Sequence, residues 1–287
     1  MNPHAISARP QEPLRIDIDA LLRARLPRHS RFVPGFAVDL LKRIVCQDVM
    51  NEALLSLQGL EGADFCRGVM EYLHVTCGIA PGSRLPSPEN RRLLFVCNHP
   101  LGGLDGVALI DIVTRWAGGI EPYFPVNDLL MALAPLHRIF VPINKHGRQC
   151  REEMGQMAEA FAGDQPIIIF PAGLVSRRGD DGTIADLEWK KMFVTYARRY
   201  RRDIVPLYFD GQNSPSFYKW ARRRVKLGLK FNIEMILLPR EMLAAAGKHF
   251  TLYAGTPIPW QQLTGGDPAH AKRIRNIVYN LKNGTDN

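Results

Sequence analysis

His99 and Asp105 are the two residues of this chain whose types and spacing best suit catalysis. They lie in the segment Phe95-Val-Cys-Asn-His-Pro-Leu-Gly-Gly-Leu-Asp-Gly106, where one short apolar run ends and another begins. This pattern predicts a buried strand, a tight turn and the start of a helix, which is where α/β folds place reactive groups. A carboxylate that accepts the Nδ1–H of an imidazole leaves Nε2 to remove a proton from a substrate hydroxyl.

A purely structural interpretation of the same pair stays open at this point. An aspartate immediately before a run of helix-forming residues is a common N-cap. A single buried histidine is more often held by ordinary hydrogen bonds than used in catalysis. The sequence around the pair is therefore needed to choose between the two interpretations.

Several segments, in the same order along the chain, resemble motifs of the glycerolipid acyltransferase superfamily, which includes the lysophospholipid acyltransferases. Asn98-His99 followed by Asp105 resembles the first motif, although five residues instead of the usual four separate the histidine from the aspartate. Glycines at 102 and 103 can absorb the extra residue, since glycine accepts backbone angles that other residues avoid. The later motifs resemble Ile139–Lys145, Phe170–Ser176 and Asp203–Phe209.

Four short segments are similar in sequence to one bacterial branch, the O-acyltransferases of glycine lipids and ornithine lipids. They are Asn98–Gly103, Phe170–Gly173, Glu188–Lys191 and Phe209–Ser214. The resemblance implies acyl transfer from a thioester of acyl carrier protein or coenzyme A to the hydroxyl of an N-(3-hydroxyacyl) amino acid. That acceptor is a lyso-glycine lipid or the related lyso-ornithine lipid. No cofactor is implied, and no metal-ligand spacing occurs in the sequence.

The resemblance also implies roles for individual residues. His99 is the expected general base, Asp105 orients it, and backbone N–H groups around Gly102 and Gly103 are expected to stabilise the oxyanion. The residues expected to bind substrate are Asn98, Gly102, Gly103, Asn144, Lys145, Arg148, Gly173, Ser176, Arg177 and Arg178. For the two arginines a solvated turn is an equally good interpretation. Lys190 and Lys191, which follow Trp189, are weaker candidates.

Departures from the superfamily pattern bear on the acceptor. Ala172 and Val175 stand where phosphate-handling members carry a glutamate and an arginine, and the second motif lacks its usual arginine. Such arginines clamp a phosphate through bidentate contacts. Their loss favours an acceptor with a single carboxylate. Phosphatidic acid synthesis by a 1-acylglycerol-3-phosphate acyltransferase, and a catalytically silent membrane-associated binding protein, remain as alternatives.

Composition limits the cellular locations and binding partners that we expect for the chain. The chain has 287 residues and a net charge of +9. Its five cysteines are an odd number with no Cys-x-x-Cys pair and no metal-ligand spacing, and the sequence has no recognisable secretory signal, so we expect reduced thiols in the cytosol. No nucleic-acid-binding signature is present, so an anionic membrane surface is the expected partner of the excess charge. The mixture of aromatic and basic residues over 217–231 suits a peripheral contact on the cytoplasmic side of the inner membrane, although an ordinary basic surface helix is as plausible.

Alternating apolar runs predict an α/β fold, with a largely parallel central sheet flanked by helices and an N-terminal helical segment. We expect residues 1–80 to form that membrane-facing segment and residues 81–287 the acyltransferase domain. The expected strands are 93–97, 123–126, 139–143, 166–170 and 204–209. The expected helices are 36–57, 65–77, 104–116, 128–134, 147–161, 186–200 and 269–281.

Overall fold

The computed structural model describes residues 14–25, 27, 30–127, 130–143, 150–228 and 232–284. The chain divides into two compact units, Met1–Gly59 and Leu60–Asn287. The division after Gly59 lies closer to the N-terminus than the boundary near residue 80 that the sequence indicates. The reason is that residues 62–79 contribute a helix and a strand to the second unit. Within the described part of the chain, no helix has the length and apolar character needed to cross a bilayer.

The first unit is helical, as expected, but it contains a break. Instead of one helix over 36–57, the chain forms α2 (Gly35–Ile44) and α3 (Gln47–Ser56), which follow α1 (Ile18–Arg25) and a 3-10 turn, Ser30–Phe32. Cys46 lies between them in the left-handed region, with φ of 52°. Polar contacts hold α3 to the segment before α1, since Asn51 on α3 exchanges two hydrogen bonds with the backbone of Ile16, at 2.8 and 2.9 Å.

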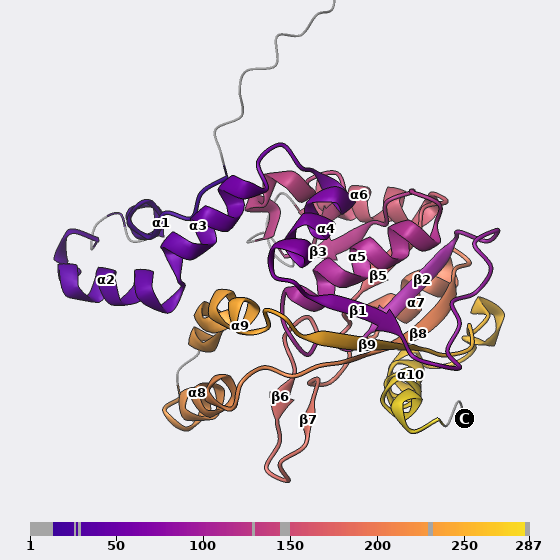
Figure 1. Ribbon diagram of the computed structural model, residues 1–287. Coiled ribbons are helices and arrows are strands. Elements are labelled where there is room, and N and C mark those ends of the chain that lie inside the picture. Colours follow the sequence, from indigo (N-terminus) through magenta and orange to yellow (C-terminus); the bar gives the residue numbers. More distant parts are fainter. Residues whose placement is uncertain are drawn as a thin grey trace, which may run out of the picture. The chain divides into compact units, whose positions relative to one another are not determined.

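The second unit is built on a largely parallel sheet, which confirms the predicted fold class (Figure 1). Its strand order is β1 (Thr76–Ile79), β9 (His249–Ala254), β8 (Asp203–Asp210), β2 (Leu93–Cys97) and β5 (Ile167–Ile169). Strand β2 pairs in parallel with both β8 and β5, while β9 runs antiparallel to β8. A parallel pair, β3 (Phe124–Val126) and β4 (Phe140–Pro142), adjoins β5 through the bridge from Tyr123 to Ile167.

Both faces of β2 are covered, and all five of its residues are buried. Leu94 and Val96 join one core with α6 (Cys150–Ala162), α7 (Met192–Arg199) and α10 (Asp267–Asn280). On the opposite face the ring of Phe95 meets Trp116 of α5 (Leu104–Trp116), with centroids 5.1 Å apart, and α5 packs on α4 (Gly62–Tyr72). Each side chain of leucine size buried in this way contributes about 1.5–3 kcal/mol, so β2 is a rigid support for whatever follows it.

Besides the divided helix over 36–57, three other expected helices differ from the structure. The helix expected over 65–77 ends at Tyr72 and gives way to β1. In the described part of 128–134 the chain forms 3-10 turns, Leu130–Ala132 and Ala134–Leu136. The helix expected from residue 186 begins only at Met192, because the indole of Trp189 donates a hydrogen bond to Asp186 and fixes a non-helical segment there.

The remaining elements follow β5 and β8. A short hairpin joins β6 (Arg177–Arg178) to β7 (Ile184–Ala185), and α8 (Pro215–Lys226) packs against β6. A 3-10 helix, Ile233–Leu237, then leads into α9 (Leu238–Ala244). Two further 3-10 turns, Trp260–Gln262 and Leu281–Asn283, flank α10.

Candidate active site

The turn between β2 and α5 brings His99 and Asp105 together. Strand β2 ends at Cys97 and α5 begins at Leu104, so the carboxylate lies in the first turn of the helix. The Nδ1 atom of His99 is 2.9 Å from Oδ2 of Asp105. Asp105 is fully buried, and the His99 side chain is 15% exposed. With Nδ1 held by the carboxylate, Nε2 is the nitrogen left for a substrate.

Asp105 is itself held by the backbone of the turn. Its Oδ2 accepts hydrogen bonds from the N–H groups of Leu101 and Gly102, at 2.9 and 3.4 Å, and its Oδ1 accepts one from Gly106 at 2.9 Å. These bonds hold the carboxylate in one orientation beneath the imidazole. They also direct the N–H of Gly102 to Asp105, whereas the sequence suggested an oxyanion partner.

Burial and the paired charges oppose each other in setting the pKa of both groups. For Asp105, burial favours the neutral acid, but the charge of His99, its hydrogen bond and the backbone donors outweigh burial and lower the pKa. For His99, burial favours the neutral ring, but the charge and hydrogen bond of Asp105, with a smaller contribution from Asp186, raise the pKa. The pair therefore stabilises the imidazolium that forms when His99 accepts a proton.

The glycines of the turn are required by its backbone and its neighbours. Gly102 has φ of 82°, and a Cβ there would lie 2.5 Å from Cγ2 of Val175 and 2.8 Å from Leu238. A Cβ on Gly103 would lie 2.9 Å from Met242. Both glycines thus face packed side chains. Their role in this structure is to let the turn pass close to its neighbours.

A second buried carboxylate, Asp186, supports the backbone of His99. The His99 N–H donates to Asp186 Oδ1 at 3.1 Å, and the hydroxyl of Ser176 and the indole of Trp189 donate to the same carboxylate at 2.6 and 2.9 Å. Burial raises the pKa of Asp186, although these three donors and the charge of His99 oppose the shift. No sequence signal pointed to this residue, which was expected to begin a helix.

The backbone of Asp186 is in turn hydrogen-bonded to α10. Its N–H donates to the hydroxyl of Tyr279 on α10 at 2.7 Å, and its carbonyl accepts from the guanidinium of Arg275 at 2.8 Å. Residues from three distant parts of the chain therefore meet under His99.

Two asparagines of the motif regions act on the backbone. Asn98 exchanges two hydrogen bonds with the backbone of Phe209 in β8, at 2.7 and 3.0 Å. The amide of Asn213 donates to the carbonyl of Pro100 at 3.2 Å. Asn98 was expected to bind substrate, but its side chain is buried and its amide is used to tie β2 to β8. Both asparagines therefore fix the position of the turn.

His99 lines a largely apolar cavity of about 380 Å³. Its ring stacks on Phe170, with centroids 4.0 Å apart and planes at 18°. The other lining residues are Phe124, Pro125, Val126, Asn127, Leu130, Ile143, Ile169, Pro171, Gly173, Lys190, Met192 and Phe193. A cavity with this lining suits a hydrocarbon chain, because each methylene group that it removes from water stabilises the bound chain by about 0.8 kcal/mol.

The remaining expected binding residues that the structure describes lie in four different places. Gly173 lines the cavity beside His99. Ser176 and Arg177 are held elsewhere, since Ser176 bonds to Asp186 and the guanidinium of Arg177 forms a 2.6 Å ion pair with buried Glu234. Asn144, Lys145 and Arg148 lie outside the described residues.

Arg178 belongs to a different surface, which we call the basic hollow. It has a volume of about 450 Å³ and is lined by Arg178, Pro215, Tyr218, Lys219, Arg222, Arg223 and Lys226. Two polar residues of the His99 cavity had little or no support from the sequence. Asn127 carried no signal, and Lys190 was only a weak candidate beside Trp189.

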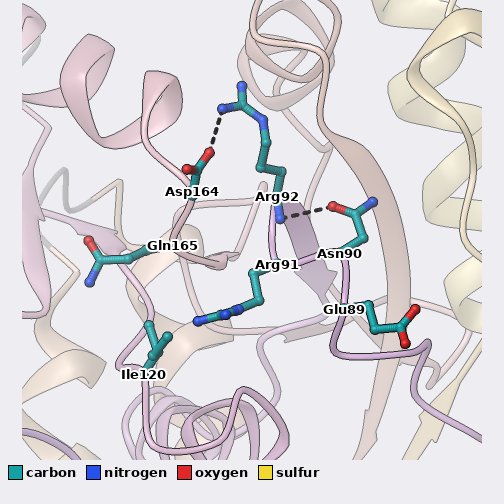
Figure 2. A pocket seen from close by; sticks show the side chains of 7 residues that line it. All are labelled: Glu89, Asn90, Arg91, Arg92, Ile120, Asp164 and Gln165. Atoms are coloured by element: carbon teal, nitrogen blue, oxygen red, sulfur yellow. Dashed lines mark hydrogen bonds and ion pairs between the residues drawn. The ribbon is translucent and has the colours of Figure 1, made fainter.

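Another hollow, of about 430 Å³, lies at the opposite end of β2 (Figure 2). Arg92 immediately precedes that strand and pairs with Asp164 at 2.8 Å, while its backbone N–H donates to Asn90 at 3.1 Å. His99 and Asp105 follow the other end of the strand, so this hollow is remote from them. Among the residues that the structure describes, no group of His, Cys, Asp or Glu side chains could hold a metal ion.

Comparison with known proteins identifies relatives over nearly the full chain. Residues 20–287 match the family described as acyltransferase. The chain is 44% identical to the lyso-glycine lipid O-acyltransferase of Phocaeicola vulgatus, over 93% of this chain and 95% of that protein. It is 42% identical to the protein of the same name from Bacteroides thetaiotaomicron, over 93% and 97% of the two chains. The 1-acyl-sn-glycerophosphate acyltransferase PlsC of Thermotoga maritima aligns with a TM-score of 0.44 at 13% identity, over 85% of this chain and 95% of that one.

Proposed function

Because the chain belongs to the acyltransferase family, and is therefore an enzyme of acyl transfer, we propose that its acceptor is N-(3-hydroxyacyl)glycine. The product is the two-chain glycine lipid, formed by O-acylation. The observation that carries this proposal is His99, which is held by Asp105 at 2.9 Å and lines an apolar cavity. The two relatives named for lyso-glycine lipid support the choice of acceptor.

The proposed mechanism uses the pair as a base. Nε2 of His99 takes the proton of the 3-hydroxyl while the oxygen attacks the carbonyl carbon of the thioester. Asp105 stabilises the imidazolium, and the tetrahedral intermediate collapses with formation of the ester and cleavage of the C–S bond. The leaving thiolate then takes the proton from His99. Proton transfer by a positioned base typically contributes 10²–10⁴-fold to the rate.

The acyl donor in this proposal is a thioester of acyl carrier protein or coenzyme A. Phe124, Phe170 and Phe193 give the cavity an apolar wall against which a hydrocarbon chain can lie. The reaction needs no metal or organic cofactor, because a thioester is already activated and a histidine supplies the base.

Phosphatidic acid synthesis is the less favoured acceptor chemistry. Arg177, which the sequence offered as an anion ligand, is committed to Glu234 and to the carbonyl of Val175 at 2.7 Å. A phosphate dianion needs several donors. The described lining of the cavity holds one cationic side chain, which suits a monoanion better.

A peripheral membrane location completes the proposal. The basic hollow on α8 places four cationic side chains of one helix, Lys219, Arg222, Arg223 and Lys226, along one surface. Trp220, Val225 and Leu227 of the same segment are exposed apolar residues. Cations beside exposed apolar groups suit the headgroup region of an anionic bilayer, which we take to be the cytoplasmic face of the inner membrane.

Acyl transfer by the purified enzyme tests the function. N-(3-hydroxyacyl)glycine and lysophosphatidic acid are offered separately with thioesters of acyl carrier protein and of coenzyme A, and the products are identified by mass spectrometry. We expect the glycine acceptor to be strongly preferred. His99→Ala should lose 10²–10⁴-fold in turnover, whereas His249→Ala, at an exposed histidine of β9, should not. A preference for lysophosphatidic acid would establish the alternative instead.

A further inference from the structure

Lys190 is the cationic side chain among the described residues that line the cavity of His99. Its backbone N–H donates to the carbonyl of Pro171 at 3.1 Å, which anchors it to the turn after β5. A Cβ built on Gly173 would lie 3.0 Å from the Nζ atom of Lys190, so the ammonium group lies directly over that glycine. Phe170, at the start of the same turn, stacks on His99.

The proposed acceptor carries its charge close to its reacting hydroxyl. Only four atoms, two carbons of the acyl chain, the amide nitrogen and the glycine Cα, separate the hydroxyl-bearing carbon from the carboxylate carbon. A substrate whose hydroxyl is at His99 therefore keeps its carboxylate inside or at the mouth of the same cavity. In surroundings that are mainly apolar, that carboxylate requires a cation or several hydrogen-bond donors.

We propose that Lys190 binds the carboxylate of the acceptor and so determines its specificity. This inference rests on the proposed function. Among the residues that the structure describes, the two motif arginines do not line this cavity, since Arg177 lies against Glu234 and Arg178 lines the basic hollow. Gly173 has a matching role, because any side chain there would displace the ammonium group that lies over it.

A comparison of a charged and a neutral acceptor tests this assignment. The measured quantity is the ratio of kcat/KM for N-(3-hydroxyacyl)glycine to that for N-(3-hydroxyacyl)glycinamide. Lys190→Met should lower this ratio about 10- to 100-fold, the range expected for one charge-assisted hydrogen bond, with most of the loss in KM. Lys190→Arg, which keeps the cation, should recover part of the ratio. Lys191→Met is the matched control and should leave the ratio unchanged, since Lys191 does not line the cavity.

Each outcome has a distinct meaning. If Lys190→Met lowers kcat/KM for both acceptors equally, or for neither, the ratio stays constant and the assignment of Lys190 is overturned, while the proposed function stands. If the wild-type enzyme does not acylate N-(3-hydroxyacyl)glycine, the proposed function fails and the assignment fails with it.

Discussion

At His99, one carboxylate meets the side chain and another meets the backbone. Asp105 accepts from the ring at 2.9 Å, and Asp186 accepts from the peptide N–H at 3.1 Å. The first sets the protonation of the imidazole, and the second sets where the imidazole stands. Both negative charges favour the imidazolium, so the charge state of His99 reports on each of them.

The pH dependence of acyl transfer tests the role of Asp105. A base must be unprotonated, so kcat/KM should rise with pH and reach its midpoint above the ordinary histidine pKa of about 6.5, because the pKa of His99 is raised. In Asp105→Asn, burial is no longer outweighed, and the midpoint should move to lower pH. The plateau should fall about 10²–10⁴-fold. An unchanged midpoint in this variant would mean that Asp105 does not set the pKa of His99.

Asp186→Asn tests the second carboxylate. The variant keeps the shape of the side chain but removes a charge and weakens the hold on the His99 backbone. We expect a lower kcat and a downward shift of the pH midpoint that is smaller than in Asp105→Asn, because Asp186 makes the smaller contribution. Asp180→Asn, at a fully exposed carboxylate on the β6–β7 hairpin, serves as the control. Loss of kcat without any shift would indicate a packing effect alone.

The sequence could predict His99 and Asp105 because both belong to one turn, and short-range spacing shows such a pair directly. It could not predict Asp186, which is 87 residues from His99 along the chain and meets it only in the folded sheet. The surroundings of Lys190 and Arg177 could not be predicted either, for a related reason. Both follow motif segments, and only the three-dimensional structure shows that Glu234 holds Arg177 while Lys190 lines the cavity.

Among the elements, the strands were the most predictable. Leu93–Cys97 and Ile167–Ile169 are short apolar runs covered on both sides, and such runs have few alternatives to a buried strand. Helix limits were less predictable. The apolar spacing over 36–57 continues through Cys46, so periodicity alone does not reveal the left-handed residue that divides the helix. The delayed start of α7 depends on a contact between Asp186 and Trp189 that local sequence does not specify.

The end of α6 depends on a buried arginine. Arg202 is fully buried, and its guanidinium donates to the carbonyls of Ala160, Phe161, Gly163 and Gln165, at 2.6–3.1 Å. Burial lowers its pKa to about 10, which still leaves it charged at neutral pH. Like a helix cap, it supplies donors to carbonyls that the helix leaves without partners.

Arg202→Met should therefore lower the free energy of unfolding by about 2–5 kcal/mol, since several buried carbonyls lose their donor. Urea denaturation measures the change through the midpoint at constant slope. Arg199→Met, at an exposed position of α7, is the control and should stay within about 0.5 kcal/mol of the parent. A loss below about 1 kcal/mol in Arg202→Met would show that water can replace the guanidinium.

For the whole molecule, the net charge of +9 was the main sequence clue to location. In the structure, the basic side chains are unevenly distributed. Cations of α8 gather at the basic hollow, whereas arginines 92, 177 and 202 are used for internal contacts. Total charge is therefore a poor measure of the surface that a membrane would meet.

Vesicle sedimentation tests the membrane proposal. Binding should increase with the fraction of anionic lipid and weaken with salt. Replacing Lys219, Arg223 and Lys226 with Gln should weaken binding about 10²-fold, from about 1 kcal/mol for each cation near an acidic surface. The control replaces three exposed cations elsewhere, Lys248, Lys272 and Arg273, and should have a smaller effect. Equal losses in the two variants would contradict a dedicated surface on α8.

The hydrogen bonds of α10 to the backbone of Asp186 constrain the order in which the site can form during synthesis. The turn that carries His99 and Asp105 emerges from the ribosome early, but Tyr279 and Arg275, which bond to the N–H and the carbonyl of Asp186, follow it much later. A nascent chain that lacks α10 therefore has its base and its carboxylate without the support that fixes their position. Catalytic competence should arrive in one late step, when this helix docks, and an unfinished chain at a membrane should leave the thioesters around it untouched.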